Sequence, residues 1–303
     1  MNGEGAIEAP AGRGVVRPVS WRGPLFIFAA ALLWSSGGLG IKSLALPPLA
    51  ITGWRSLFAL PLLFFCGAFR GAGRKDFREP AIFVTILSYT ATLSLFVTAT
   101  KLTTAANAIL LQYTSPFWVI LLSLWVFKEK PRARDLLMSV GCFAGLSLFM
   151  LDRVSAEGKL GILLAILSGM SMAMMTLGLR SSGRRAEGTR ALFAMFFGNV
   201  LCSLVCLPAM IRSFGGIDAR SWRVLAALGV FQIALPYVLF SIGVREVPPL
   251  RATLIAMIEP ILNPVWVAWL IHEVPGRGAI LGGALILLSL LLDATIPRRA
   301  ETA

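Results

Sequence analysis

Apolar stretches about 20 residues long recur along the chain, and short clusters of charged or turn-forming residues separate them. A helix of this length crosses the roughly 30 Å hydrocarbon core of a bilayer. The connections are too short to hold a soluble domain. The pattern predicts an all-α integral membrane protein with ten transmembrane helices, at 24–44, 49–69, 80–99, 104–127, 136–152, 159–179, 191–211, 224–244, 250–271 and 279–296.

One part of this pattern occurs twice, because residues 96–131 and 240–275 align without a gap. Each copy holds the end of one predicted span and the whole of the next, so the repeated unit is a membrane hairpin. Duplicated sets of spans are common in transporters. Five spans per half is an odd number, which predicts two inverted five-helix repeats. Identical aligned pairs include Phe96 with Phe240, Pro116 with Pro260, Trp125 with Trp269, Glu129 with Glu273, and Pro131 with Pro275.

The duplication gives the expected domain organisation. The first repeat covers 22–155 with helices 1–5, and the second covers 156–297 with helices 6–10. Residues 1–21 are expected to form a disordered cytoplasmic N-terminus, and 298–303 a cytoplasmic tail. The first apolar run lacks a clear cleavage site, so a signal peptide is not expected.

Lys and Arg residues are unevenly divided between the two sides of the predicted membrane. With the N-terminus in the cytoplasm, 19 of them fall on the cytoplasmic side and eight on the other, and Arg55 lies within a span. Cytoplasmic loops carry an excess of these residues. The division predicts that both termini are cytoplasmic.

Composition narrows the functional classes. Apolar residues make up 57% of the chain and charged residues 14%, with a mean hydropathy of +0.79, whereas soluble domains carry about 25% charge. The net charge of +13 is spread over helix ends, so nucleic-acid binding is not expected. The chain has one histidine, His272, and four cysteines within apolar spans. No metal site, cofactor or catalytic machinery is therefore expected.

Several short motifs, taken in order, resemble those of the drug/metabolite transporters built from two EamA-type repeats. The resemblance covers about residues 22–297 and rests on both repeats. The motifs are Trp34 within 31–37, Trp54-Arg55 opening span 2, the span 3–4 link at 100–106, Pro116 with 128–131, and Glu259-Pro260 with 272–275.

The resemblance implies a ten-helix inverted-repeat fold and a multi-pass carrier of the cell inner membrane, often an exporter of amino acids or other metabolites. Among such proteins the chain is most similar to YddG-type exporters of aromatic and other neutral amino acids. The repeats also differ, because Glu259 of the second aligns with Ser115 of the first. The two halves therefore offer a substrate different surfaces.

Polar residues inside a membrane bundle are costly, so each is a candidate for the transport site. Glu259 is the only acid near the middle of a span. It suits a substrate ammonium or a proton, and it equally suits a glutamate that stabilises the helix kink at Pro260. Pro116 and Pro260 are predicted hinges. Arg55 could bind a carboxylate, but a structural role is favoured, in which it extends outward to the interface or pairs with an acid of another helix. Lys42 is expected to extend to the interface.

All three tyrosines lie in the middle of spans, as do several tryptophans and amides. Lipid-facing tyrosine usually lies at the membrane interface, so these side chains are better placed facing a cavity. Ordinary helix packing is the alternative for each of them. The predicted substrate-binding residues are Trp34, Tyr89, Gln112, Tyr113, Trp118, Asn199, Gln232, Tyr237, Glu259 and Asn263.

These features favour a secondary transporter that moves small neutral metabolites, above all aromatic or other neutral amino acids, by alternating access. An unpaired charge in such a cavity costs several kcal/mol, which disfavours polyanions and dications. Carriage of cationic drugs or nucleotide sugars is the alternative, and an intramembrane enzyme is a distant one. The expected partners are the solute and the bilayer, with a homodimer left open.

Overall fold

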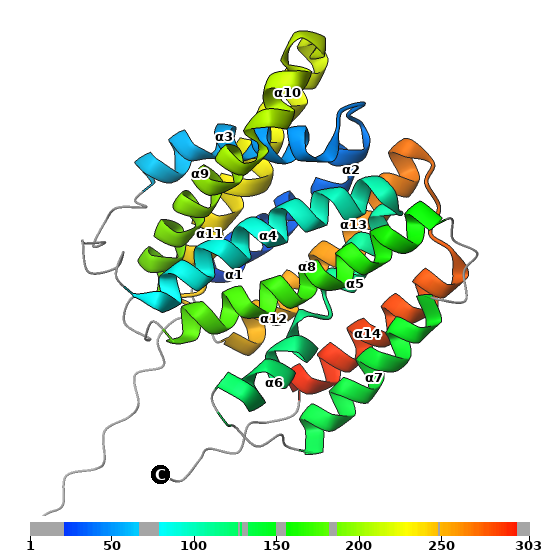
Figure 1. Ribbon diagram of the computed structural model, residues 1–303. Coiled ribbons are helices and arrows are strands. Elements are labelled where there is room, and N and C mark those ends of the chain that lie inside the picture. The colour runs from blue at the N-terminus through cyan, green and yellow to red at the C-terminus, as the bar shows by residue number, and fades with distance from the viewer. Residues whose placement is uncertain are drawn as a thin grey trace, which may run out of the picture.

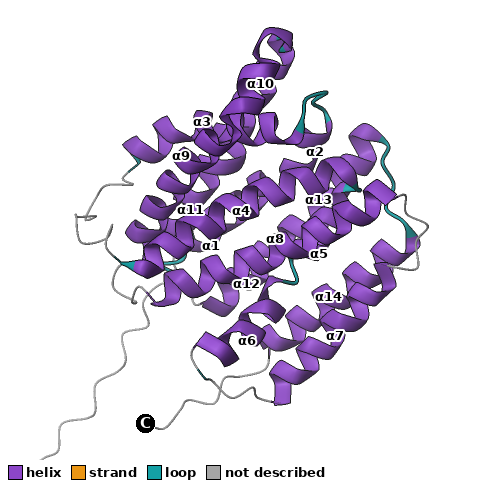
Figure 2. Ribbon diagram, in the orientation of Figure 1, coloured by secondary structure: helices purple, strands orange, loops and turns teal. Residues whose placement is uncertain are grey.

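The computed structural model describes residues 21–66, 79–126, 128, 133–149, 156–181, 187–247 and 249–295, and these ranges contain helices and no strand (Figure 2). The helices pack into one bundle (Figure 1). Their order is α1 (Arg22–Ser35), α2 (Gly37–Lys42), α3 (Pro48–Phe65), α4 (Pro80–Leu102), α5 (Ala105–Gln112), α6 (Ser115–Val126), α7 (Ala133–Phe149), α8 (Ala156–Ser181), α9 (Glu187–Ser213), η3 (Phe214–Gly216), α10 (Ala219–Ala227), η4 (Leu228–Ala234), α11 (Leu235–Gly243), α12 (Pro249–Ala256), α13 (Ile258–Ile271) and α14 (Arg277–Thr295).

Eight helical segments among the described residues are long and apolar enough to span a membrane. They match predicted spans 1–4 and 6–9. Spans 5 and 10 correspond to shorter apolar stretches, Leu137–Leu148 within α7 and Arg277–Leu292 within α14. The integral membrane fold is therefore confirmed, while the count of ten stays a prediction. The predicted N-terminal segment, the tail and Glu129 to Pro131 lie outside the described residues.

Three membrane segments are each built from two helices. The first is interrupted at Ser36, the fourth at Tyr113 and Thr114, and the ninth at Met257. The last two interruptions come just before Pro116 and Pro260, which lack the N–H that would bond the carbonyl four residues back. At Ser36 the two following glycines weaken the helix.

The eighth segment contains a wider turn, the π-helix η4, directly before α11. Pro236 at the start of α11 cannot donate to the carbonyl of Gln232, and a π turn accommodates such a loss. The sequence contained this proline, but only Pro116 and Pro260 were predicted to bend helices.

The main contacts between distant helices pair the first part of the chain with the second. Helix α4 packs along α8, α1 along α11, α3 along α9, and α7 along α14; Figure 1 shows α7 and α14 side by side at one edge of the bundle. Glycines permit close approach. A Cβ on Gly243 would lie 2.8 Å from the Gly23 carbonyl oxygen, and one on Gly145 would lie 2.8 Å from that of Gly282.

Candidate functional site

The two interrupted segments of the duplicated hairpins meet through Tyr113 and Glu259. The Tyr113 hydroxyl lies 2.9 Å from Glu259 Oε2, to which it donates, and 3.2 Å from the carbonyl oxygen of Ala256. Ala256 stands four residues before Pro260, so this carbonyl has no helical N–H partner. The Tyr113 hydroxyl has a single proton, which lies within reach of both the Glu259 carboxyl group and the carbonyl that the proline frees.

An aromatic cluster joins helices α1, α4 and α11. The Tyr237 ring lies edge-on to Trp34 at 5.1 Å and to Tyr89 at 5.8 Å between ring centroids. Trp34 also contacts Phe240 at 5.4 Å. Asn199 of α9 donates to the Tyr89 hydroxyl at 3.0 Å. Four of the predicted binding residues thus gather in one place, drawn from four helices.

Arg55 of α3 is buried inside the bundle, with 1% of its surface exposed. Its Nη1 donates to Gln232 Oε1 at 3.1 Å, and its Nε has no hydrogen-bond partner. Among the residues that the structure describes, no carboxylate forms an ion pair with Arg55. The guanidinium lies within electrostatic range of Tyr89 and Tyr237. Arg55 therefore neither reaches the interface nor pairs with a described acid, contrary to the structural roles that the sequence favoured.

Gln232 connects Arg55 to the interruption of the first membrane segment. It lies on the π-helix, and a Cβ on Gly37 would lie 2.8 Å from its amide nitrogen. Just before the same interruption, Ser35 Oγ accepts a hydrogen bond of 3.0 Å from Trp266 Nε1. Irregular backbone in both segments thus lies beside the polar groups, as in carriers whose broken helices form the binding site.

Three predicted binding residues lie outside the aromatic cluster, although Asn263 lies against the same interruption as Gln232. Gln112 donates to Ser168 at 2.7 Å and ties α5 to α8. Trp118 donates to Thr114 of its own segment at 3.2 Å. Asn263 is buried, its amide has no partner among the described residues, and its oxygen faces Gly38. Nothing in these contacts links the three to the aromatic cluster.

A network of ionic and backbone contacts closes one end of the bundle. Lys42 forms an ion pair with Glu273 at 2.6 Å and donates to the Thr103 carbonyl oxygen at 2.6 Å. Glu273 also accepts the Ala105 N–H at 2.7 Å, and Lys101 donates to the Leu44 carbonyl oxygen at 2.8 Å. Lys42 was expected to extend toward the interface. The structure shows it paired with the carboxylate of Glu273, a contact that the apolar residues following it at 43–47 did not indicate.

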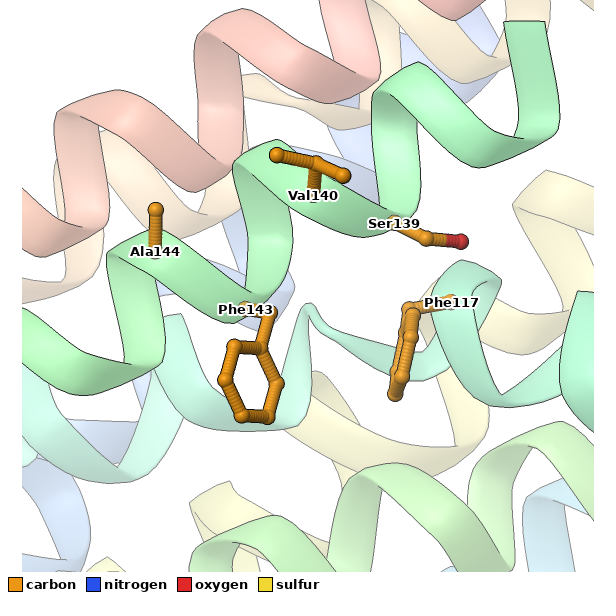
Figure 3. Close-up of a pocket in the computed structure, with 5 residues that line it drawn as sticks. All are labelled: Phe117, Ser139, Val140, Phe143 and Ala144. Carbon is orange, nitrogen blue, oxygen red and sulfur yellow. The ribbon is translucent and has the colours of Figure 1, made fainter. Parts of the chain in front are cut away.

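A shallow groove opens between α6 and α7 (Figure 3). It is lined by Phe117, Ser139, Val140, Phe143 and Ala144. Val140 and Phe143 are largely exposed, as befits side chains that meet lipid tails. The lining contains no charged group and none of the predicted binding residues, so the groove is a poor candidate for a polar solute.

The sequence-based selection omitted Arg55 and Ser35. Arg55 carried a clear signal, since a charge inside a span is a functional candidate by default. Only the packed structure, however, shows that no described acid pairs with it. Ser35 had no comparable signal. Among the described residues, no group of three His, Cys, Asp or Glu side chains is placed to hold a metal ion.

A bundle of apolar, interrupted membrane helices with carboxyl, guanidinium, amide and phenol groups between them defines a multi-pass membrane protein of the transporter type. The amino-acid sequence identifies the family within this class. The chain belongs to the EamA-like transporter family, whose model matches residues 21–151 and again 159–294, as the resemblance to two EamA-type repeats predicted.

Two relatives cover nearly the whole chain. An "Uncharacterized transporter" of Archaeoglobus fulgidus is 29% identical over 89% of this chain and 95% of its own length. The "Uncharacterized transporter YwfM" of Bacillus subtilis is 26% identical over 92% and 96%. A solved structure, described only as "Crystal structure of protein", has a TM-score of 0.60 and 21% identity over 90% of this chain and 96% of that one. That structure supports the fold alone.

Proposed function

We propose that this EamA-family protein is a secondary transporter of small neutral metabolites, with aromatic or other neutral amino acids as its substrates and export as its direction. The observation that carries the substrate class is the pairing of Tyr113 with Glu259 within electrostatic range of Tyr237, which packs against Trp34 and Tyr89. Tyr237 lies within electrostatic range of both Glu259 and Arg55. One acid, one base and an aromatic wall complement a zwitterion with an apolar side chain.

The opposing charges also argue against the alternatives. A nucleotide sugar would bring at least two negative charges to a region with one arginine and one glutamate. A dication would meet a single carboxyl group. Each charge left unpaired in such surroundings costs several kcal/mol.

We further propose ten spans in two inverted five-helix repeats, in a cell inner membrane with both termini cytoplasmic. The helix contacts support a twofold relation between the halves. If spans are numbered 1–10, exchanging the halves turns the α4–α8 contact of spans 3 and 6 into the α1–α11 contact of spans 8 and 1. The α3–α9 and α7–α14 pairs, which join spans 2 with 7 and 5 with 10, are unchanged by the exchange.

Cysteine labelling from either side of the membrane tests the topology. Positions Arg74 and Ile217 should be labelled from opposite sides, in a background without the four native cysteines. Labelling of both positions from one side would contradict the inverted repeat.

Counterflow in liposomes tests the substrate. Purified protein in vesicles preloaded with phenylalanine or leucine should accumulate the radiolabelled amino acid, whereas vesicles preloaded with a nucleotide sugar should not accumulate that sugar. A Glu259→Ala variant of equal folded yield provides the control for leak. Exchange of the nucleotide sugar alone would overturn the amino-acid proposal, and exchange of an organic cation alone would favour drug export.

A further inference from the structure

The buried guanidinium of Arg55 lacks the partners that a purely structural arginine needs. An arginine carries five N–H donors and one positive charge. Gln232 is its only hydrogen-bond acceptor among the described residues, and the acceptor is neutral. Nε is buried and has no partner. Removing a charge from water without a counter-charge is expensive, so the fold bears a cost at this position that packing alone does not explain.

The surroundings of Arg55 favour an anionic ligand. Two thiols and two phenols lie within electrostatic range of the guanidinium, those of Cys202, Tyr89, Tyr237 and Cys206. Gln232 reaches Arg55 from a π-helix, a backbone irregularity that is frequent at functional sites. Glu259, an acid inside the bundle, is held by Tyr113 and forms no ion pair among the described residues. Arg55 and Glu259 thus both lie within electrostatic range of Tyr237 but form no ion pair with each other.

We propose that Arg55 is the carboxylate-binding residue of the transport site, where it receives the carboxylate of the substrate. The fork of N–H groups on a guanidinium matches the two oxygens of a carboxylate. In this assignment Gln232 is a neutral acceptor that accompanies Arg55, and Glu259 faces the amino end of the substrate. The proposal rests on the amino-acid transport proposed above. It adds the residue that distinguishes a substrate with a carboxylate from the corresponding amide.

Two substitutions separate this role from a structural one. Arg55→Met keeps an unbranched apolar stem, although a shorter one, and removes the charge. Gln232→Glu supplies a resident carboxylate next to an intact Arg55, which would compete with the substrate. Arg212→Gln is the matched control, because Arg212 is exposed at the end of α9 and bonds only the Pro208 carbonyl.

Ligand-induced thermal stabilisation of the purified full-length chain gives the readout, with three probes that share one side chain. Phenylalanine carries both charges, phenylalaninamide lacks the carboxylate, and 3-phenylpropionate lacks the ammonium. Both site variants should bind phenylalanine and 3-phenylpropionate about 10- to 100-fold more weakly than wild type, as expected for one charged hydrogen-bonded contact. Binding of phenylalaninamide, a cation, should not weaken, because both variants make the site less positive, and Arg212→Gln should behave as wild type.

The ligand-free proteins provide an independent measure. Both site variants should melt at or above the wild-type temperature, since Arg55→Met removes the unpaired buried charge and Gln232→Glu provides it with a counter-charge. If phenylalaninamide binding falls as much as phenylalanine binding, or if both variants melt lower with unchanged ligand preference, Arg55 is structural and the proposal is wrong.

The two proposals fail in different ways. If wild type binds 3-phenylpropionate but not phenylalanine, and Arg55→Met loses this binding, the amino-acid proposal fails and the carboxylate site stands. If wild type binds phenylalanine and phenylalaninamide equally, the amino-acid proposal stands and the carboxylate site fails. If neither phenylalanine nor 3-phenylpropionate stabilises the wild-type protein, both proposals are wrong.

Discussion

The two copies of the membrane hairpin share a backbone and differ in chemistry. Residues 96–131 and 240–275 align with a constant offset, and the helices follow it. Helix α5 begins at Ala105 and α12 at the aligned Pro249, and they end at the aligned Gln112 and Ala256. Both copies are interrupted directly after these helices. The duplicated prolines thus determine where each copy breaks.

The polar residues at the two interruptions are not duplicated. Tyr113 aligns with Met257, and Ser115 aligns with Glu259. The tyrosine that only the first copy has meets the glutamate that only the second copy has. A site between two similar halves can therefore be asymmetric, which a ligand with two unlike ends requires.

The helix starts differ for a related reason. The first N–H of α5, on Ala105, is bound by the carboxylate of Glu273. The first residue of α12 is Pro249, which has no N–H to satisfy. One copy uses a distant carboxylate where the other uses a proline.

The largest effect is expected from making the two copies alike at Glu259. Glu259→Ser gives the second copy the residue of the first, and amino-acid flux should fall at least about ten-fold, since a contact to a carboxyl group is lost. Ser115→Ala, the aligned control, should leave flux near wild type. Flux that survives Glu259→Ser in liposome counterflow would show that the asymmetry is incidental.

Removing the shared prolines should have the next largest effect. In Pro116→Ala and Pro260→Ala, the new N–H can rejoin the carbonyl one turn back and straighten the segment. Flux should fall several-fold in both, and more in Pro260→Ala, because the Ala256 carbonyl would no longer need Tyr113. The folded yield, measured by size-exclusion chromatography, should change less. Unchanged flux in both variants would argue against prolines as hinges.

The difference at the helix starts predicts a stability effect. Glu273→Ala removes the ion pair with Lys42 and the acceptor for Ala105, and should lower the free energy of unfolding by about 1–3 kcal/mol. Ala105→Pro copies the second hairpin and removes only the donor, so its thermal melt in detergent should remain close to wild type. Equal losses in both variants would mean that the Ala105 contact, and not the ion pair, dominates.

The smallest effect is expected at the first turns of α4 and α10, which begin the spans that precede the two interrupted ones. Asp218 caps α10 by accepting the Ser221 N–H at 3.1 Å, whereas α4 has no side-chain cap. Hydrogen bonds from Ser221 lower the pKa of Asp218 below its ordinary value. A lowered pKa in the folded state means that the cap stabilises above the ordinary carboxyl pKa and is lost as pH falls through the lowered one.

Amide hydrogen exchange can detect this cap. Protection of the first turn of α10 should decrease as the solution is acidified, and Asp218→Asn should make it independent of pH. The first turn of α4 should show no such change. A pH-independent α10 in the wild-type protein would contradict the assignment.

Much of the fold followed from hydropathy. The apolar runs and their charged boundaries located the eight long membrane segments, and Pro116 and Pro260 marked two of the three interruptions. The interruption at Ser36 and the π-helix before Pro236 were missed, because glycines and a proline inside an apolar run do not by themselves indicate which distortion results.

The candidate site was only partly predictable. Mid-span polarity singled out Tyr89, Tyr237, Trp34 and Asn199, which do meet. It equally singled out Gln112, Trp118 and Asn263, whose contacts lie elsewhere. Polarity marks a residue that needs a partner, but it does not say whether the partner lies on the same helix or on another.

The sequence by itself determined the membrane class, the positions of the eight long membrane segments, the duplicated hairpin and the family. Only the tertiary structure decided that Tyr113 meets Glu259, 146 residues away, and that Arg55 meets Gln232, 177 residues away. The physical reason is that these spans are apolar around their whole circumference, so no hydrophobic face fixes how each helix is rotated. Rotation is set instead by small residues, prolines and the few polar groups where helices touch.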